Sequence, residues 1–301
     1  MTTSIIVYAP QSMGNPKFKS YGNVSGQRCE MAGGEPGLQE LKQRIKAVWT
    51  AGDFGKLAPH IQREAEAFVG RIGLKPGMKV LDVGCGTGNQ SIPAACAGAI
   101  VTGVDIAPNL LAQAEKRARD EKVNIQFQEA DVEALPFSDG EFDVVMSMFA
   151  AMFAPRPKVA AAEMVRVCRP GGVIAMANWI PGSFIAERHE IASRYAPAPV
   201  SLESPMLWGD EVVVCERFGE GVTVSATKRT LVFDIPMSPG ETNEHYSQYS
   251  GSTQMLMRRL DPQRWDALFK ELIAHWTNRN RGGATHTIVA SDYLEVHARR
   301  T

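Results

Sequence analysis

The amino-acid sequence predicts an α/β fold, a doubly wound and mostly parallel sheet with a C-terminal antiparallel strand pair and a helical lid inserted before the last strand. Short apolar runs alternate with amphipathic stretches from about residue 80 to residue 179, which is typical of βαβ units whose strands are covered on both faces. A glycine-rich turn follows the first run. Two β-branched stretches, 222–235 and 285–299, alternate as strands do, and the long helical segment between them predicts the lid.

The elements follow one another in a regular order. Residues 1–36 are rich in Gly, Ser, Asn and Pro, so we expect a flexible arm there and one folded domain over 37–301. Helical spacing of apolar residues begins at Leu38, and a second helix is expected over about 59–72. The parallel strands are expected at 80–83, 100–106, 125–130, 142–147 and 173–179. Cap or lid segments are expected at about 180–220 and 236–284, the second with one helix through Tyr246 to Met257 and another over 262–275.

The turn after the first strand predicts a bound nucleoside. Its glycines stand at alternate positions, where they let the backbone turn sharply and approach a ligand closely. The spacing G-x-G-x-G differs from the G-x-G-x-x-G of nicotinamide and flavin sites. An acid also lies inside the strand end, two residues before the first glycine. We therefore expect a cofactor other than NAD, bound by Asp82, Gly84, Cys85, Gly86 and Gly88.

Two later strand ends also carry acids. Asp105 ends the second strand, next to Ile106, where a carboxylate can accept hydrogen bonds from two ribose hydroxyls. This position predicts a ligand that contains adenosine. Asp131 follows the third strand, and two interpretations stay open for it: its carboxylate accepts from an adenine amino group beside the backbone N–H of Val132, or it caps a short turn that begins at Glu133.

Four sequence blocks carry a resemblance to a known family. They are VLDVGCGTGNQ, GVDIAPNLLAQAEKRA, QEADVEALPFSDGEFDVVMSMFAAMF and EMVRVCRPGGVIAMANW, in this order. Over about residues 40–180 the chain resembles the class I S-adenosylmethionine-dependent methyltransferases, in the branch similar to the ubiquinone and menaquinone biosynthesis enzymes. The resemblance implies a Rossmann-like fold, S-adenosylmethionine as cofactor, S-adenosylhomocysteine as product, adenine binding by Asp131 and Val132, and a first helix that folds over the cofactor. Met148, at the end of the fourth strand, completes the expected cofactor-binding residues.

The segment after the fourth strand is unusually apolar for a loop beside a polar cofactor. Its side chains either pack into the core or line a pocket for an apolar or aromatic acceptor. Phe149, Met152 and Phe153 are therefore acceptor-contact candidates. Trp179, at the end of the fifth strand, either stacks on a flat substrate or covers the core.

No catalytic residue can be assigned from a motif. The sulfonium of the implied cofactor already activates the methyl group, so no metal is expected, and the main task is in-line positioning in a desolvated pocket. A hydroxyl or phenol acceptor would also need a proton acceptor. His189, His245 and Tyr246 are the candidates, and solvated or packed helix positions explain them as well.

Composition narrows the class of partner. The 301 residues carry 32 Lys and Arg against 33 Asp and Glu, so no strong field favours nucleic acid or lipid. No membrane insertion is expected, and five scattered cysteines without a C-x-x-C pair fit a reducing cytoplasm. We predict methyl transfer to a small-molecule acceptor that is apolar or aromatic. The sequence does not determine the oligomeric state, and a homo-oligomer is one of the possibilities. One alternative is a non-catalytic S-adenosylmethionine binder or sensor. The other is an NAD-dependent oxidoreductase, against which the glycine spacing of this chain argues.

Overall fold

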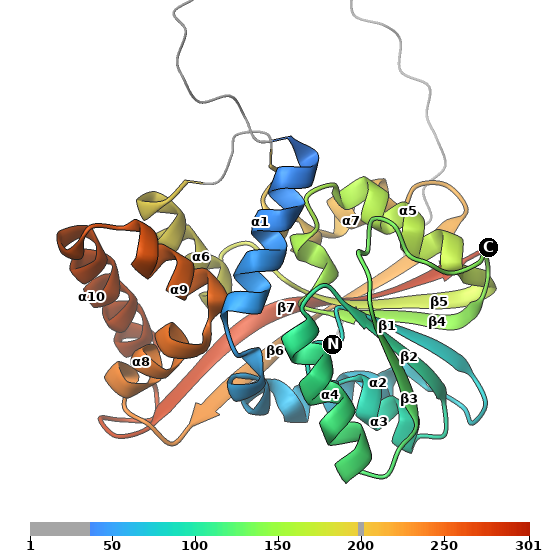
Figure 1. Cartoon of the computed structure of the whole chain (residues 1–301), viewed down its shortest axis with the longest axis horizontal. Coiled ribbons are helices and arrows are strands. Elements are labelled where there is room, and N and C mark those ends of the chain that lie inside the picture. The colour runs from blue at the N-terminus through green and yellow to red at the C-terminus, as the bar shows by residue number, and fades with distance from the viewer. Residues whose placement is uncertain (1–36, 198–201) are drawn as a thin grey trace, which may run out of the picture.

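The computed structural model describes residues 37–197 and 202–301 (Figure 1). The expected N-terminal arm, 1–36, lies outside the described residues. One sheet of seven strands forms the centre, in the order β3-β2-β1-β4-β5-β7-β6. The strands are β1 Lys79–Val83, β2 Ile100–Asp105, β3 Ile125–Glu129, β4 Phe142–Met148, β5 Cys168–Trp179, β6 Val222–Ile235 and β7 Thr287–Arg300. Strands β1 to β5 are parallel to one another, and β7 is antiparallel to both β5 and β6. The predicted fold class is confirmed.

The strand order reverses between β1 and β4, because the chain moves outward through β2 and β3 and then returns to the other side of β1. Ligands of open α/β sheets bind at the carboxyl ends of the strands beside such a reversal. The predicted glycine turn lies at that edge. The fold therefore puts the candidate cofactor residues where the topology favours a ligand.

The helices fall into two groups (Figure 1). Those interleaved with the strands are α2 Gln62–Ile72, α3 Ser91–Cys96, α4 Pro108–Asp120, α5 Pro157–Val167 and α7 Glu211–Phe218. A second group packs together at one end of the molecule and is called the cap below. The cap consists of α6 Phe184–Tyr195, α8 Pro239–Tyr249, α9 Gly251–Arg259 and α10 Pro262–Arg279. Helix α1, Leu38–Ala51, runs between the cap and the rest of the molecule (Figure 1).

The β6–β7 pair supports the cap. Its pairing with β5 reaches Trp179, opposite Tyr293, whereas β6 and β7 stay paired to Ile235 and Thr287. The two strands therefore project past the carboxyl end of β5, and α8 to α10 are inserted at their tip. Ser238 and Glu241 form a capping box that starts α8 directly after β6. Buried Ile191, Leu268 and Leu272 join α6 to α10.

Two predicted elements have different bounds in the structure. The single helix expected through Tyr246 to Met257 is wrong: it is two helices, α8 and α9, separated at Ser250. Strand β5 begins at Cys168 rather than at residue 173, because a register shift against β4 brings the Pro-Gly-Gly segment into the strand. Within the described part of the expected segment 180–220, α6 joins the cap, whereas α7 packs against α5.

Gly251, the first residue of α9, leaves no room for a side chain. A Cβ on Gly251 would overlap the carbonyl oxygen of Val48 and lie 3.0 Å from the amide nitrogen of Gly52. The end of α1 and the start of α9 thus cross with their backbones in contact. The amide of Asp53 also donates to the carbonyl of Tyr249 at 2.9 Å. Within the described ranges, no helix combines the length and the apolar character that a bilayer span requires.

This crossing predicts the effect of Gly251→Ala. The added methyl group forces α1 away from α9, and overpacking of this kind costs about 1–3 kcal/mol of unfolding free energy. Gly70→Ala is the matched control, because a Cβ at this exposed position of α2 meets no atom within 4 Å; it should stabilise by about 0.5–1 kcal/mol. Urea unfolding measures both, and a Gly251→Ala protein as stable as wild type would contradict the crossing.

Candidate functional site

The glycine turn is shaped by left-handed backbone. Gly84, Gly86 and Gly88 have φ values of 71°, 54° and 85°, a region that residues with a Cβ avoid. A Cβ on Gly84 would overlap Ala150, whereas one on Gly86 would meet no atom within 4 Å. The amides of Gly84 and Cys85 both donate to the carbonyl of Val104, at 2.8 and 2.9 Å. The turn is therefore tied to β2, and its open side at Gly86 leaves the backbone accessible to a ligand.

Asp105 is oriented by the same turn. One carboxylate oxygen accepts from the amide of Gly86 at 2.9 Å, and the other accepts from the amide of Ala107 at 2.9 Å. Burial raises the pKa of Asp105, and these backbone N–H groups oppose the rise. Each carboxylate oxygen has two acceptor sites, so both can take a further hydrogen bond. The geometry suits the predicted pairing with two ribose hydroxyls.

Asp82 lies fully enclosed in β1, below the turn. One oxygen accepts from the hydroxyl of Ser91 at 2.5 Å, while the other, Oδ1, has no partner. Burial raises the pKa of Asp82 to about 7, with a further contribution from the charge of Asp105. Cys85 is also buried, and Ile106 is partly exposed beside Asp105. An unpartnered carboxylate oxygen beneath a ligand-binding turn is consistent with the predicted cofactor role of Asp82.

Asp131 makes the hydrogen bond of a turn cap. Its Oδ1 accepts from the amide of Glu133 at 2.9 Å, and its Oδ2 accepts from Lys42 of α1 at 2.6 Å. Lys42 also pairs with the buried Glu133 at 2.7 Å, and Glu133 pairs with Arg156 at 2.8 Å. Adenine binding by Asp131 and partly exposed Val132 stays a prediction, since the capping bond leaves acceptor sites on both oxygens.

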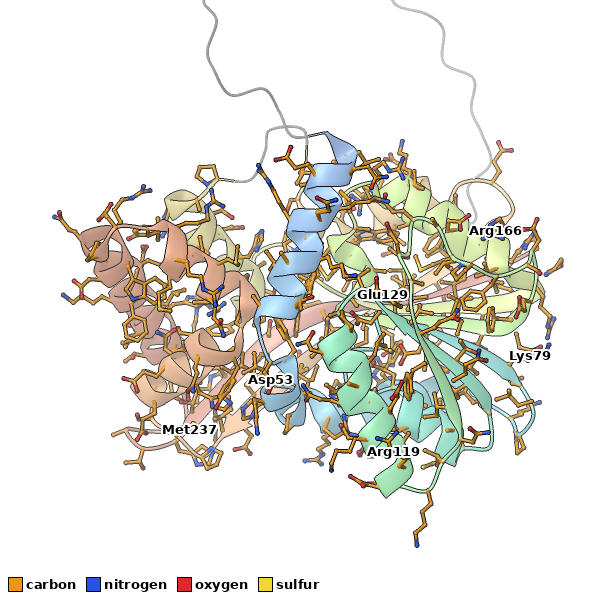
Figure 2. The ribbon with its side chains drawn as sticks, in the orientation of Figure 1. Asp53, Lys79, Arg119, Glu129, Arg166 and Met237 are labelled. Carbon is orange, nitrogen blue, oxygen red and sulfur yellow. The ribbon has the colours of Figure 1, made fainter. Side chains whose placement is uncertain are left out.

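Helix α1 lies over this edge of the sheet without entering the core. None of its residues is buried. Lys42 holds it to the loop after β3, and Lys46 pairs at 2.5 Å with Glu129, the last residue of β3, which Figure 2 labels beside α1. At its other end the Trp49 ring lies 5.3 Å from the Phe153 ring. The helix thus covers the strand ends through ion pairs and one aromatic contact.

The side chains of the apolar loop after β4 differ in burial, and their contact with an acceptor stays a prediction. Met148 and Met152 are 4 % and 1 % exposed and belong to the core. Phe149 and Phe153 are partly exposed. Phe149 stacks on Trp179, with ring centres 3.7 Å apart and planes at 4°, and Tyr293 meets the Phe149 ring edge to face at 5.4 Å. We call Phe149, Trp179 and Tyr293 the aromatic wall.

Phe149 also has a φ of 56°, which is rare for a residue with a side chain. Its amide donates to the carbonyl of Ala177 at 2.8 Å, which fixes this backbone. Strained backbone of this kind costs about 1–3 kcal/mol and gathers at functional sites. With this backbone conformation, the Phe149 ring lies against Trp179 at the carboxyl edge of the sheet.

The three predicted proton-acceptor candidates differ in their surroundings. His189 is exposed on α6, and His245 lies with Nε2 3.2 Å from the carbonyl oxygen of Lys56. Tyr246 is buried, and burial raises the pKa of its hydroxyl, which keeps it protonated at neutral pH. Tyr246 is thus suited to donate a hydrogen bond rather than to accept a proton.

Sequence reasoning missed His60. Its ring stacks on Tyr246 at 5.9 Å and lies 5.5 Å from the His245 ring. Its Nε2 is enclosed without a hydrogen-bond partner. Burial lowers the pKa of His60, and the neighbouring His245 lowers it further, so the imidazole is neutral at pH 7 and able to accept a proton. No motif surrounds His60, and only the tertiary contacts single it out.

Comparisons with known proteins agree with this geometry. Residues 81–176 match a family model described as a methyltransferase domain. The chain is 38 % identical over 240 residues to an uncharacterised protein of Mycobacterium tuberculosis strain H37Rv, covering 75 % of this chain and 87 % of that protein. It is 40 % identical over 116 residues to a demethylmenaquinone methyltransferase of Renibacterium salmoninarum, covering 38 % of this chain and 47 % of that enzyme.

A solved structure shows the same fold. The YcgJ protein of Bacillus subtilis superposes with a TM-score of 0.55 at 16 % sequence identity. The superposition covers 79 % of this chain and 98 % of the YcgJ chain.

The orientation of Asp105 predicts the effect of Asp105→Ala on binding of S-adenosylhomocysteine. Hydrogen bonds to a charged group are worth about 1.5–3 kcal/mol each, so calorimetric titration should show affinity reduced at least about tenfold. Asp143→Ala is the matched control, because Asp143 likewise accepts a backbone amide, that of Lys79, but at the amino edge of the sheet. Unchanged affinity in a folded Asp105→Ala protein would rule out the ribose role.

The raised pKa of Asp82 predicts a pH-dependent stability. The folded protein keeps this proton up to about pH 7, whereas the unfolded chain loses it near the ordinary pKa of 3.8. Protonation therefore contributes stability that is fully present below the unfolded pKa and is lost as the pH rises through the folded pKa. The size of this pKa shift limits the contribution of Asp82 protonation to the unfolding free energy to at most about 4 kcal/mol.

Asp82→Asn removes this ionisation. Its Tm should consequently fall less than that of wild type between pH 5 and pH 8, measured by thermal melting without cofactor. Asp143→Asn serves as control, because the ion pair with Arg169 holds the pKa of Asp143 below its usual range. Equal slopes for Asp82→Asn and wild type would show that Asp82 is ionised throughout.

Proposed function

Because this chain belongs to the class I S-adenosylmethionine-dependent methyltransferases, we propose that it methylates a small-molecule acceptor with an apolar or aromatic body. Transfer would occur by in-line displacement in a desolvated pocket. The observation that carries the proposal is the aromatic wall at the carboxyl edge of the sheet.

The aromatic wall is joined directly to the cofactor turn. Gly84 packs against Ala150, the residue after Phe149. Strand β4 lies between β1, which leads into the turn, and β5, which ends at Trp179. Neighbouring strands are about 4.8 Å apart, so the ends of β1 and β5 are separated by about 10 Å. A flat acceptor stacked on the wall would thus lie within reach of a cofactor held at Gly86.

The residues of the chain supply binding and positioning. S-adenosylmethionine, when bound, supplies an activated methyl group, so the protein needs to align the acceptor and exclude water. Asp105 and the Gly86 backbone would hold the adenosine part. Phe149 and Trp179 would orient the acceptor ring, and α1, through Trp49, would cover the strand ends.

A hydroxyl acceptor would also lose a proton. His60 supports such a step better than the candidates expected from sequence, since its neutral ring has an unpartnered Nε2. It contacts Tyr246, whose ring lies 6.3 Å from Phe233, and Phe233 lies 6.3 Å from Trp179. His60 is therefore part of the same aromatic cluster as the wall.

An acceptor related to quinone precursors is one form of this proposal. The partial identity with a demethylmenaquinone methyltransferase supports it, as does the stacking geometry of Phe149 and Trp179. The cysteines among the described residues, Cys85, Cys96, Cys168 and Cys215, are unpaired, which supports work in a reducing cytoplasm.

Methyl transfer to a panel of phenols, hydroquinones and aromatic acids, followed as S-adenosylhomocysteine release, tests the proposal. With any acceptor that is turned over, Phe149→Ala should raise the acceptor KM about tenfold, because loss of one stacked ring costs about 1.4 kcal/mol, while the affinity for S-adenosylhomocysteine changes less than about twofold. Phe137→Ala is the control, since Phe137 is a partly buried ring in an edge-to-face pair remote from this site.

Two results would contradict the proposal. One is an acceptor KM that is the same in Phe149→Ala and wild type. The other is cofactor binding without turnover of any panel member, which would favour a binder or sensor.

A further inference from the structure

Arg188 of α6 is a cation that has no acidic partner among the described residues. Its Nη2 donates to the hydroxyl of Thr253 in α9 at 3.3 Å, the only hydrogen bond that it makes to residues 37–197 and 202–301. Its Nε is enclosed and has no partner. The nearest aromatic contact is with Tyr246, whose ring centre lies 5.9 Å from the guanidinium carbon. The rest of the side chain is partly exposed.

Other enclosed arginines of the described chain have a carboxylate partner or several hydrogen bonds, although Nη1 of Arg217 also has no partner. Arg217 pairs with Glu203 at 2.7 Å, and Arg71 pairs with Glu64 and Glu295, each at 2.7 Å. Arg117 has no carboxylate partner but donates to oxygens of Thr87, Asn89 and Gln62. Burial of a charge is costly unless hydrogen bonds or an opposite charge offset it. Arg188 has one long hydrogen bond to a neutral hydroxyl.

The acids nearest to Arg188 in sequence do not pair with it. Glu187 pairs with Arg279 and faces His275 at 3.9 Å. Glu190 is exposed. Burial lowers the pKa of the Arg188 guanidinium, opposed by Tyr246 and by no carboxylate. The described residues around Arg188 therefore supply no negative charge to pair with this cation.

The adjacent face of α8 has unused polar groups. Asn243 is fully buried, and neither its amide oxygen nor its amide nitrogen has a partner. The hydroxyl of Ser247 is likewise unpartnered. Residues 243, 246 and 247 share one face of a helix, so these groups lie on the side of α8 that includes Tyr246. Buried polar atoms without partners are rare in native structures, and a ligand is one explanation for them.

This polar region borders the aromatic wall. Tyr246 contacts Phe233, and Phe233 contacts Trp179. A continuous row of rings thus runs from Phe149, beside the cofactor turn, to Arg188 in the cap. The Arg188 end of the cap is therefore connected to the aromatic wall by packed rings.

We propose that Arg188 binds a carboxylate of the acceptor, with Asn243 and Ser247 as further hydrogen-bonding groups. The inference rests on the proposed function and narrows the acceptor class to aromatic or apolar acids. A planar guanidinium is well matched to a carboxylate. A monoanion is the better fit than a phosphate, because the neighbouring His275 is kept neutral by burial and the site offers one positive charge.

Calorimetric titration of the full chain, saturated with S-adenosylhomocysteine, tests the assignment with two probes of one shape. 4-Hydroxybenzoate carries the carboxylate, and 4-hydroxybenzamide replaces it by a neutral amide. Wild type should bind the acid at least about tenfold more tightly than the amide. The free energy of a hydrogen bond between two charged groups corresponds to a change in affinity of at least this factor. Arg188→Gln should abolish the preference and leave the amide affinity unchanged. Arg188→Lys should keep part of the preference.

Arg194→Gln is the matched control, because it removes a positive charge from the same helix at a site where Arg194 pairs with Glu271. It should keep the preference for the acid. Equal binding of the two probes to wild type, or binding of neither, overturns the inference, as does a preference that survives Arg188→Gln. Thermal melting checks folding, and Arg188→Gln should melt no earlier than wild type without ligand, because an uncompensated charge has been removed.

The result that would contradict the proposed function differs from the results that would overturn the role of Arg188. The proposed function is contradicted by cofactor binding without methyl transfer to any member of the acceptor panel, neutral or acidic. Turnover of neutral acceptors with no preference for acids would leave the proposed function standing and remove only the role of Arg188.

Discussion

One carbonyl group organises the cofactor edge of this protein. The Val104 oxygen accepts from the amides of both Gly84 and Cys85, and the next residue, Asp105, accepts from the amide of Gly86. Three consecutive amides of the turn are thus fixed by the end of β2. This arrangement needs left-handed backbone at Gly84 and Gly86, so the glycines and the acid depend on one another. The orientation of Asp105 is a consequence of the turn and is set before any ligand binds.

The second constraint is the length of the β6–β7 pair. Because these strands continue past Trp179, α8 to α10 lie beyond the carboxyl edge and face the loops that end β4 and β5. The same projection brings Tyr246 against His60 and Arg188, which come from segments far apart in the chain. The cap is therefore positioned by the sheet itself, and the contact of Gly251 with α1 fixes its other side.

The sequence was sufficient to predict the structural features that depend on residues close together in the chain. Apolar periodicity, the glycine spacing and acids at the ends of the first three strands predicted the sheet and the turn, because these features depend on neighbouring residues. Long-range contacts were not accessible in this way. Lys42 reaches Asp131 across 89 positions, and His245 reaches Lys56 across 189. Likewise, the left-handed backbone of Phe149 is a feature that no propensity of this residue predicts.

Buried polar atoms without partners lie both beneath the turn, at Asp82, and in the cap. Around the turn, Asp105 and the backbone amides are already hydrogen-bonded, so the cofactor edge is preorganised. In the cap, Arg188, Asn243 and Ser247 have polar atoms without partners, and at its border Phe149 holds strained backbone. Such features lower the stability of the free protein, and they are tolerated where binding compensates them. Selection of the acceptor is thus expected to reside in the cap, whereas the sheet edge supplies what every methyl transfer of this kind requires.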